Sequence, residues 1–321
     1  MTVTLTETLT TQDPDDPRRS RAPRKRTDRS TRSLKDTLGG WAFIGPAFLV
    51  VIGLSFFPAA WSFILSLQEW NGFSQAEFVG ADNYAKLMTD AEFGQAALQT
   101  GLYVMLFVPA SVLAGLFLAV ALNRNIRFIG LYRTAIFVPF VASAAATGIL
   151  STYLFSPQYG LVNNVLRQLG LPAQGWLEDP TQAMLVIAIM SLWGQAAFTT
   201  VIYLAALQDI PVELLEAARI DGASPWQTFW RIVWPELGPV TIFVTVWQVI
   251  GALQLFDLVY TTTRGGPLDS TKTIVYFLWE KAFKGLDFGY GSAAAYVLFV
   301  ITLLITGGMV LYARRKNLDA F

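Results

Sequence analysis

The sequence predicts an all-α integral membrane protein with six transmembrane helices and a cytoplasmic helix-turn-helix loop. Three observations support this fold class. The 321-residue chain is 54% hydrophobic and only 14% charged, six of its segments are long and apolar, and Lys and Arg are unevenly divided between the segments that join them. A soluble domain of this length would leave too much apolar surface in water, whereas a bilayer would solvate it.

Each candidate span reaches the roughly 20 residues that a helix needs to cross about 30 Å of hydrocarbon. The six candidates cover residues 41–67, 99–122, 130–155, 182–207, 238–260 and 292–313. Pro58, Pro109 and Pro139 lie inside or near the ends of three of them, where proline usually introduces a kink. Gly307 and Gly308 in the last span would allow another helix to approach closely.

The positive charges predict the orientation. With a cytoplasmic N-terminus, the inside segments hold 17 Lys and Arg residues and the outside segments six; without the N-terminal tail the ratio is eight to six. The positive-inside rule therefore favours both termini in the cytoplasm of a multi-pass protein. The short basic segments at 123–127 and 313–316 directly adjoin spans and agree with this orientation.

Three domains are predicted: a basic cytoplasmic tail (1–36), a transmembrane domain (37–316) that contains a cytoplasmic loop (208–239), and a cytoplasmic C-terminal end (317–321). The tail has almost no apolar residues, so we expect it to be disordered. It is interpreted as an orientation anchor that also touches anionic lipid, with a regulatory role as the alternative. It does not resemble a cleavable signal peptide.

The three outside segments, 68–98, 156–181 and 261–291, are predicted to connect spans, and their length also suits contact with a partner on the outer face. The third contains Arg264-Gly265-Gly266-Pro267, a turn signal.

The absence of Cys and His limits the chemistry. Without them the chain has no disulfide frame, no thiolate metal site and no histidine proton shuttle. We therefore predict no catalytic residue and no metal ligand.

The loop 208–239 predicts a first short helix that ends in a tight turn. Pro211 suits a first helical turn. Glu213 and Glu216 lie early in the helix, where its dipole favours negative charge. Gly222 is placed to end the helix in a left-handed conformation.

A second short helix is predicted directly after this turn. Ser224 and Gln227 have the spacing of a capping box, and Pro225 suits the first helical position. Pro235 and Pro239 are expected to end this helix before the next span.

The first short helix suits recognition by a partner protein. Leu214, Leu215 and Ala218 form an apolar stripe, and the small Ala217 and Ala218 would allow a close approach. Short helices of this kind enter grooves on other proteins. The alternative, an amphipathic helix lying on lipid, fits the pattern equally well.

The same loop resembles the EAA loop of ABC-importer permeases. That pattern is EAA, three residues, Gly, nine residues, Ile, one residue and Leu-Pro. Glu216-Ala217-Ala218, Gly222, Ile232 and Pro235 match it, and Trp234 stands in place of the Leu. FVGADNYAKLM (78–88), TRGGP (263–267) and FGYGSAAAYVLFVI (288–301) are similar to the carbohydrate-uptake branch. TRGGP and the ending ARRKNLDAF are more like the first subunit, of the maltose-F or glycerol-phosphate-A type. The resemblance covers about residues 38–316.

The resemblance implies a complex in the plasma (cytoplasmic) membrane of a prokaryote. Its other members would be a second related permease subunit, two ATPase subunits and an extracytoplasmic solute-binding protein. The chain has no GxxxxGK[ST] phosphate loop, so ATP and Mg²⁺ would be bound by the partner ATPase subunits and no cofactor by this chain. The residues implied for the coupling helix and its turn are Glu216, Ala217, Ala218, Asp221 and Gly222. ATP-driven closure of the motor subunits would then rock the spans between inward and outward access.

Two spans carry polar residues suited to a sugar. Ser191, Gln195 and Thr199 recur every four residues, and Gln248 and Gln254 lie in the next span. Sugars need hydrogen-bonding groups and aromatic faces, which Trp193, Phe198 and Trp247 would offer. The predicted substrate-pathway residues are Ser191, Gln195, Phe198, Gln248, Gly251 and Ala252. Hydrogen bonding to the partner permease is the alternative. Asp257 is interpreted as a capping or partner-contact residue rather than a proton carrier.

We therefore expect a non-catalytic permease subunit of an ATP-driven importer for a sugar or sugar-like solute. Disaccharides, longer oligosaccharides, polyols and glycerophosphodiesters remain open as substrates. An ion-gradient-driven secondary transporter is the main alternative, although neither a relay of buried acids nor an inverted repeat is visible. A membrane-embedded enzyme would need clustered nucleophiles, acids, bases or metal ligands.

Overall fold

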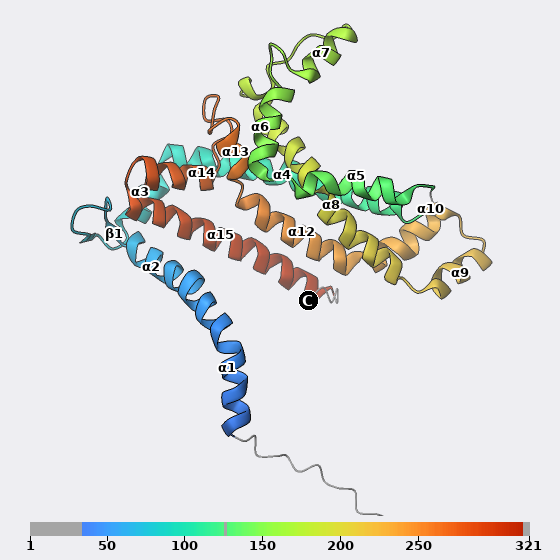
Figure 1. The fold of residues 1–321 in the computed structure, drawn as a ribbon, viewed down its shortest axis with the longest axis horizontal. Coiled ribbons are helices and arrows are strands. Elements are labelled where there is room, and N and C mark those ends of the chain that lie inside the picture. The colour runs from blue at the N-terminus through green and yellow to red at the C-terminus, as the bar shows by residue number, and fades with distance from the viewer. Residues whose placement is uncertain (1–33, 125–126, 317–321) are drawn as a thin grey trace, which may run out of the picture. The chain divides into compact units, whose positions relative to one another are not determined.

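The computed structural model describes residues 34–124 and 127–316 (Figure 1), and the side chains from residue 41 onward. The regular elements of the described residues are helices and turns of helix, apart from a two-residue antiparallel pairing of β1 (Gln68–Glu69) with β2 (Glu77–Phe78). Five helical segments are long and apolar enough to cross a membrane, and a bent pair makes a sixth candidate. The predicted all-α membrane fold is confirmed, whereas most of the predicted tail and residues 317–321 lie outside the described residues.

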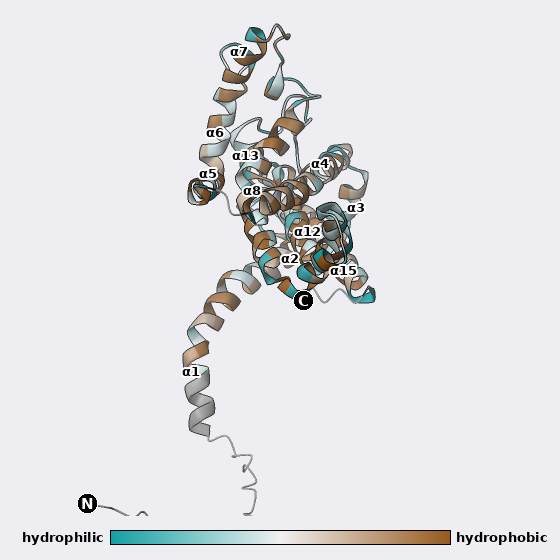
Figure 2. Ribbon diagram, turned by 90° about the vertical axis from the view of Figure 1, so that its right-hand side faces the viewer, coloured by the Kyte–Doolittle hydropathy of each residue, from teal (hydrophilic) through white to brown (hydrophobic). Residues whose placement is uncertain are grey.

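The chain divides into two compact units, residues 1–58 and 59–321. In the first, α1 (Leu34–Val51) continues through the π turn η1 (Ile52–Phe56) into the start of α2 (Phe57–Ser66). Described side chains of this helix, such as Phe43, Leu49 and Leu54, are exposed. Exposed apolar residues of this kind are expected where a helix meets lipid. Figure 2 shows that hydrophobic residues also predominate along the other long helices.

The second unit is built on α4 (Ala91–Leu122), α8 (Ala183–Asp209), α12 (Gly238–Leu253) and α15 (Phe288–Arg315). Their core includes Tyr103, Ile187, Val249 and Tyr290, all buried. The close approach of α4 to α8 depends on Gly115, because a Cβ atom there would lie 2.5 Å from the Thr199 Cβ. The remaining elements of this unit are α3 (Asp82–Thr89), α5 (Ile129–Val141), α6 (Ala144–Leu154), α7 (Leu161–Gln168), η2 (Trp176–Glu178), α9 (Val212–Ile220), α10 (Pro225–Thr228), η3 (Phe229–Val233), α11 (Trp234–Glu236), α13 (Asp257–Thr261), α14 (Ile274–Trp279) and η4 (Glu280–Lys284).

The predicted span 130–155 is not one straight helix. Its two halves, α5 and α6, are bent by 99°. Ser143 between them is extended, and its Oγ accepts a hydrogen bond from the Ala146 N–H at 3.2 Å, so it begins a new helix. The predicted span 238–260 is also interrupted, since α12 ends at Leu253 and α13 begins at Asp257.

Two other span boundaries also differ from the prediction. α4 begins at Ala91 and α15 at Phe288, both earlier than expected. Asp90 and Asp287 cap these helices by accepting hydrogen bonds from backbone N–H groups. Part of the predicted connection 68–98 is therefore helical.

The loop before α14 is tied to the start of α4 by a cluster of charges. The Lys272 Nζ atom lies 2.8 Å from a Glu92 oxygen and 3.0 Å from oxygens of Asp269 and Glu280, and the Lys281 Nζ lies 2.7 Å from the other Glu92 oxygen. Burial by itself would lower the pKa of Lys272, but its hydrogen bonds to the three carboxylates raise it above the ordinary value. This lysine is therefore charged at neutral pH although only 8% of it is exposed.

Candidate functional site

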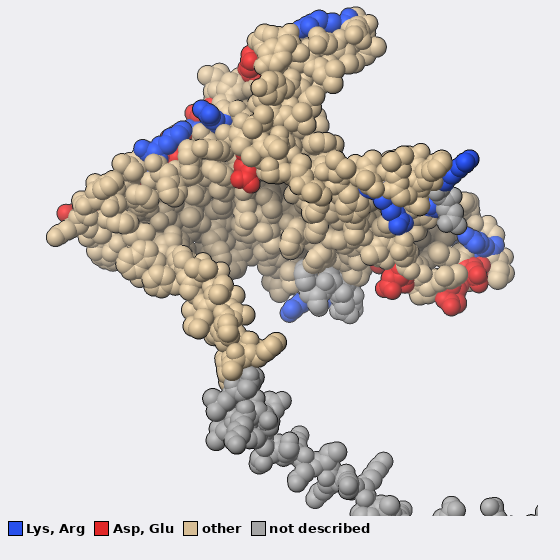
Figure 3. All heavy atoms as spheres, viewed as in Figure 1, with Lys and Arg blue, Asp and Glu red and all other residues tan. Residues whose placement is uncertain are grey.

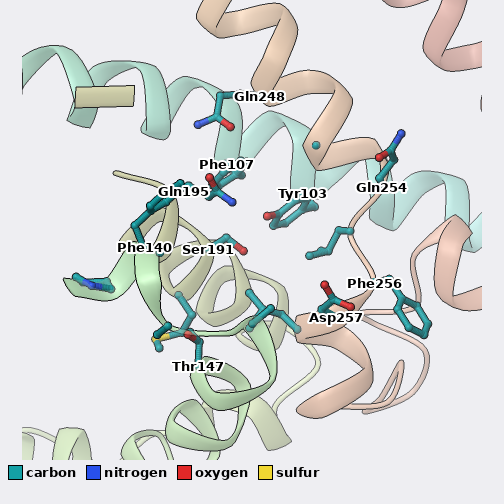
Figure 4. A pocket seen from close by; sticks show the side chains of 18 residues that line it. Tyr103, Phe107, Phe140, Thr147, Ser191, Gln195, Gln248, Gln254, Phe256 and Asp257 are labelled. Carbon is teal, nitrogen blue, oxygen red and sulfur yellow. The ribbon is translucent and has the colours of Figure 1, made fainter. Parts of the chain in front are cut away.

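A polar cavity of about 280 Å³ lies among α4, α5, α6, α8, α12 and α13 (Figure 4). It opens between helices far apart in the sequence, and both broken spans reach it. The break after α12 contributes Gln254, Leu255 and Phe256 to its wall. The other lining residues are Tyr103, Phe107, Pro139, Phe140, Ala142, Ala144, Thr147, Met190, Ser191, Gly194, Gln195, Gln248, Gly251, Asp257 and Leu258.

Four of the six residues predicted for the substrate pathway line this cavity: Ser191, Gln195, Gln248 and Gly251. The other two do not. Phe198 stacks between Phe140 and Trp247, with ring centroids 6.4 and 5.4 Å away. Ala252 is 1% exposed and belongs to the hydrophobic core. From the helical period alone, the sequence could not show that Gly251 lines the cavity while the neighbouring Ala252 belongs to the core.

Gln248 is held at a junction of three helices. Its Nε2 atom donates to the Ser111 Oγ at 2.5 Å and to the Thr199 Oγ1 at 3.2 Å. The two hydroxyls are themselves hydrogen-bonded at 3.2 Å. α4, α8 and α12 are thus joined by one buried network, which also fixes the rotamer of the Gln248 amide at the cavity wall.

The aromatic wall of the cavity was not predicted from the sequence. The rings of Tyr103 and Phe107 on α4 are stacked with centroids 5.3 Å apart and an interplanar angle of 5°. They lie one helical turn apart, a spacing that in the sequence alone is equally typical of a lipid-facing or core stripe. Their position opposite Ser191 and Gln195 becomes visible only in the fold (Figure 4).

Among the described residues that line the cavity, Asp257 is the one acid. It begins α13 directly after the break at 254–256. Asp257 lies in the first turn of α13, but the N-cap is Phe256 and no side chain caps this helix, so the structure shows no capping hydrogen bond from Asp257. Its side chain lines the cavity, as does that of Gln254 (Figure 4). The break therefore brings an amide and a carboxylate to the same wall.

The predicted helix-turn-helix is present at the end of this unit opposite α3 and α14 (Figure 1). α9 ends at Ile220 with Asp221 as its C-cap, and Gly222 follows in the expected left-handed conformation, with a φ of +74°. The Gly222 N–H donates to the Arg219 carbonyl at 3.1 Å and the Ala223 N–H to the Ala218 carbonyl at 2.9 Å. These two bonds form a Schellman motif, which requires the left-handed conformation that glycine adopts without strain.

The second short helix begins with the predicted capping box. The Ser224 N–H donates to the Gln227 Oε1 at 2.8 Å, and the Gln227 N–H donates to the Ser224 Oγ at 3.3 Å. The prediction that Pro235 ends this helix was wrong. The helix passes through the π turn η3 and includes Pro235 in α11, which ends at Glu236. A π turn widens the backbone just before the proline, where the missing N–H would otherwise interrupt an α-helical ladder.

The residues implied for ATPase coupling lie on both sides of α9 and its turn. Glu216, Ala217, Asp221 and Gly222 are exposed. Ala218 is 6% exposed and faces the chain's own interior. The exposed surface of α9 at the turn has few protruding atoms, because Ala217 has only a methyl group and Gly222 has no side chain. α9 therefore offers a partner a close approach to its backbone at the turn.

Comparisons with known proteins agree with these features. Residues 111–319 match the family model described as "Binding-protein-dependent transport system inner membrane component". The lactose transport system permease protein LacF of Rhizobium radiobacter is 36% identical over 91% of this chain and 99% of its own length. The sn-glycerol-3-phosphate transport system permease protein UgpA of Agrobacterium fabrum is 30% identical over 86% of this chain and 94% of its own length.

The fold is similar to that of a solved transporter subunit. A chain in the crystal structure of a bacterial alginate ABC transporter, in complex with an alginate pentasaccharide-bound periplasmic protein, superposes with a TM-score of 0.79. The match covers 89% of this chain and 98% of that chain, at 22% sequence identity. At this identity the likeness shows a shared fold.

Proposed function

The chain belongs to the family of binding-protein-dependent transport system inner membrane components, and we propose that its polar cavity forms part of the path of a sugar or sugar-like solute. The protein is a multi-pass permease subunit of an ABC importer and is not itself the ATP-hydrolysing component. We further propose which residues contact the solute and which contact the ATPase subunits.

The observation that carries the proposal is the chemistry of the cavity wall. It combines amides (Gln195, Gln254), a hydroxyl (Ser191) and the stacked rings of Tyr103 and Phe107. Sugar hydroxyls need donors and acceptors, and the apolar faces of sugar rings stack on aromatic side chains. Gln248 would contribute its Oε1 atom, because its Nε2 is engaged by Ser111 and Thr199. The names of the lactose and glycerol-phosphate permeases support the same solute class.

The cavity in this chain is half of a shared path. Its volume of about 280 Å³ is at the lower limit of the about 300–1,000 Å³ typical of small-molecule sites. We expect a second related permease subunit to supply the other half, two ATPase subunits to bind on the cytoplasmic side, and an extracytoplasmic solute-binding protein to deliver the solute. In the proposed coupling, Glu216, Ala217, Asp221 and Gly222 contact one ATPase subunit, while Ala218 anchors α9 to the permease.

The test is transport by the complete complex, reconstituted in liposomes with the cognate binding protein. We expect Gln195→Ala and Gln254→Ala to reduce solute uptake about tenfold, since a lost hydrogen bond to a bound solute costs about 1.5 kcal/mol. Gln168→Ala, an exposed glutamine at the end of α7, is the matched control and should transport normally.

Two results would contradict the proposal. Unchanged uptake in both cavity variants would remove the cavity from the solute path. Uptake by this chain without an ATPase subunit would favour an ion-gradient-driven transporter.

A further inference from the structure

A groove of about 740 Å³ lies beside the coupling loop and is separate from the polar cavity. Its floor contains Leu116 and Leu207, each 8% exposed, and its rim contains Leu113 and Phe117, 63% and 72% exposed. Of the described residues that line it, only Arg124 and Arg219 are charged. The groove is thus apolar along its length and cationic at one end.

The dimensions of the groove match one leaflet of a bilayer. Its residues follow a helical stripe along α4 from Leu113 through Phe117 and Val120 to the C-cap Asn123, and Arg124 comes next. Eleven residues at about 1.5 Å rise cover about 16 Å, roughly half of the about 30 Å hydrocarbon thickness. The cationic end therefore lies at the level expected for headgroups when the apolar part lies in the acyl region.

The rest of the cationic end is built for an interface between membrane and water. Trp226 and Trp230 line it, are 70% and 46% exposed, and contact each other edge to face with centroids 5.5 Å apart. Tryptophan is enriched at the headgroup level because its ring is apolar and its N–H is polar. The capping box at Ser224 and Gln227 holds this short helix in place.

Arg124 and Arg219 form no ion pair within the part of the chain that the structure describes. All six ion pairs among the described residues lie in the segments 86–92 and 269–287, at the other end of the unit, and none includes Arg124 or Arg219. Figure 3 shows both Lys and Arg and Asp and Glu side chains at the end of the molecule that carries α9 and α10, but no acidic residue is among the described residues that line the groove. Basic pockets beside transmembrane helices on the cytoplasmic side suit anionic lipid headgroups.

We propose that this groove binds an anionic glycerophospholipid, with its phosphate between Arg124 and Arg219 and an acyl chain along Leu113, Leu116 and Phe117. The site goes beyond the solute path and the ATPase contact. It places a lipid against the back of the coupling loop, because Arg219 belongs to α9 and Trp226 to α10.

The experiment uses the complete transporter in nanodiscs that contain trace photoactivatable phosphatidylglycerol or photoactivatable phosphatidylcholine. Labelled peptides are identified by mass spectrometry. We expect phosphatidylglycerol to label the 113–124 and 219–230 segments preferentially. In Arg124→Gln/Arg219→Gln this labelling should fall about 25-fold, since the loss of each cation near anionic lipid weakens binding about fivefold.

Arg231→Gln is the matched control, because Arg231 is exposed in the same loop and does not line the groove. It should keep the labelling. Val120→Trp, which fills the apolar part and leaves both arginines, should lose it. Excess inorganic phosphate should not compete, since the acyl chain supplies much of the binding.

Equal labelling by the two lipids, or unchanged labelling in the double variant, would overturn the proposal. So would competition by inorganic phosphate alone. The fourth contrary outcome is that neither lipid labels the groove, because the ATPase or the second permease covers it. Because the readout is lipid labelling, it is independent of whether the solute path has been assigned correctly.

Discussion

Gly222 is the residue whose backbone decides the direction of the coupling loop. Its φ of +74° reverses the chain between α9 and α10, and a Cβ atom there would have no heavy atom within 4 Å. A side chain at this position is therefore opposed by backbone conformation and not by a steric clash within this chain. A partner that approaches the turn closely would add a steric cost of its own.

Substitutions at Gly222 can separate the cost of backbone strain from the cost of a steric clash with a partner. Gly222→Ala and Gly222→Asn keep the side chain small, and Asn tolerates the left-handed conformation better. We expect Gly222→Ala to destabilise the turn by about 1–2 kcal/mol and to weaken solute-stimulated ATPase activity in the full complex, with Gly222→Asn less affected. Gly222→Val should abolish coupling while the spans still insert. Normal ATP-driven transport by Gly222→Val would exclude the turn from coupling.

Ser111 offers a way to test the three-helix junction without touching the cavity wall, since it is fully buried and does not line the cavity. We expect Ser111→Ala to lower stability by about 0.6–2 kcal/mol, the usual range for hydrogen bonds between membrane helices. It should also raise the KM for solute uptake, because Gln248 loses its 2.5 Å partner. Thermal unfolding in detergent and uptake kinetics measure the two effects. Thr302→Ala on α15, which removes only a hydrogen bond within its own helix, is the control for hydroxyl loss.

At the scale of elements, the caps around the turn at Gly222 were predictable, whereas the bends and several other helix ends were not. The caps of α9 and α10 depend on residues within five positions of each other, so Gly222, Ser224 and Gln227 predicted them. Ser143 is a residue type that favours a helix N-cap and could have predicted the bend at 142–143. The apolar residues on both sides of it instead favoured one continuous span. Gln248 in the cavity wall is held by Ser111 and Thr199, which are 88 positions apart, and no local pattern brings them together.

Asp90 connects the start of α4 to α15 and predicts a pH dependence. Its carboxylate accepts hydrogen bonds from the Tyr290 hydroxyl at 2.6 Å and the Glu92 N–H at 2.8 Å. Burial by itself would raise the pKa of Asp90, but these bonds and one from the Phe93 N–H lower it. Since the pKa is lower in the folded state, the stabilisation is present at neutral pH and is lost as the pH falls through the folded value.

We therefore expect Asp90→Asn to lower the thermal unfolding temperature at pH 7 and to differ less from the parent protein as the pH falls below about 4. Unfolding scans in detergent across this range measure the difference. Asp82→Asn, in the first turn of α3 and exposed, provides the comparison. A difference that stays constant with pH would show that the Asp90 charge contributes nothing.

At the scale of the whole molecule, the distribution of charge agrees with the proposed orientation. Lys86, Lys272, Lys281 and Lys284 on the proposed outer side all form ion pairs. Arg124 and Arg219 on the proposed cytoplasmic side form none among the described residues. Two arginines on the proposed outer side, Arg167 and Arg264, also form no ion pair, but the described Lys and Arg residues without one are more numerous on the cytoplasmic side, where they include Arg127, Arg133, Arg231, Arg314, Arg315 and Lys316. Among the described residues, most of the positive charge without a carboxylate partner therefore lies on the side that the positive-inside rule requires.

The absence of cysteine makes this orientation directly measurable. Gln75→Cys lies in the exposed connection between β1 and β2, and Gln208→Cys is exposed near the end of α8. We expect a membrane-impermeant maleimide to label Gln75→Cys in intact spheroplasts and Gln208→Cys only in inside-out vesicles. The reverse pattern would place both termini outside and would move the coupling loop away from any cytoplasmic motor.

The network of Ser111, Thr199 and Gln248 has a consequence for how the protein moves. Three helices fastened to one another at a buried point cannot slide independently without exposing unpaired polar atoms to a dry interior. We expect α4, α8 and α12 to travel as one block when the motor closes. The hinges would then lie at the two helix interruptions, residues 142–143 and 254–256, which flank the cavity. Residues such as Gln254 would therefore both take part in the hinge motion and contact the solute.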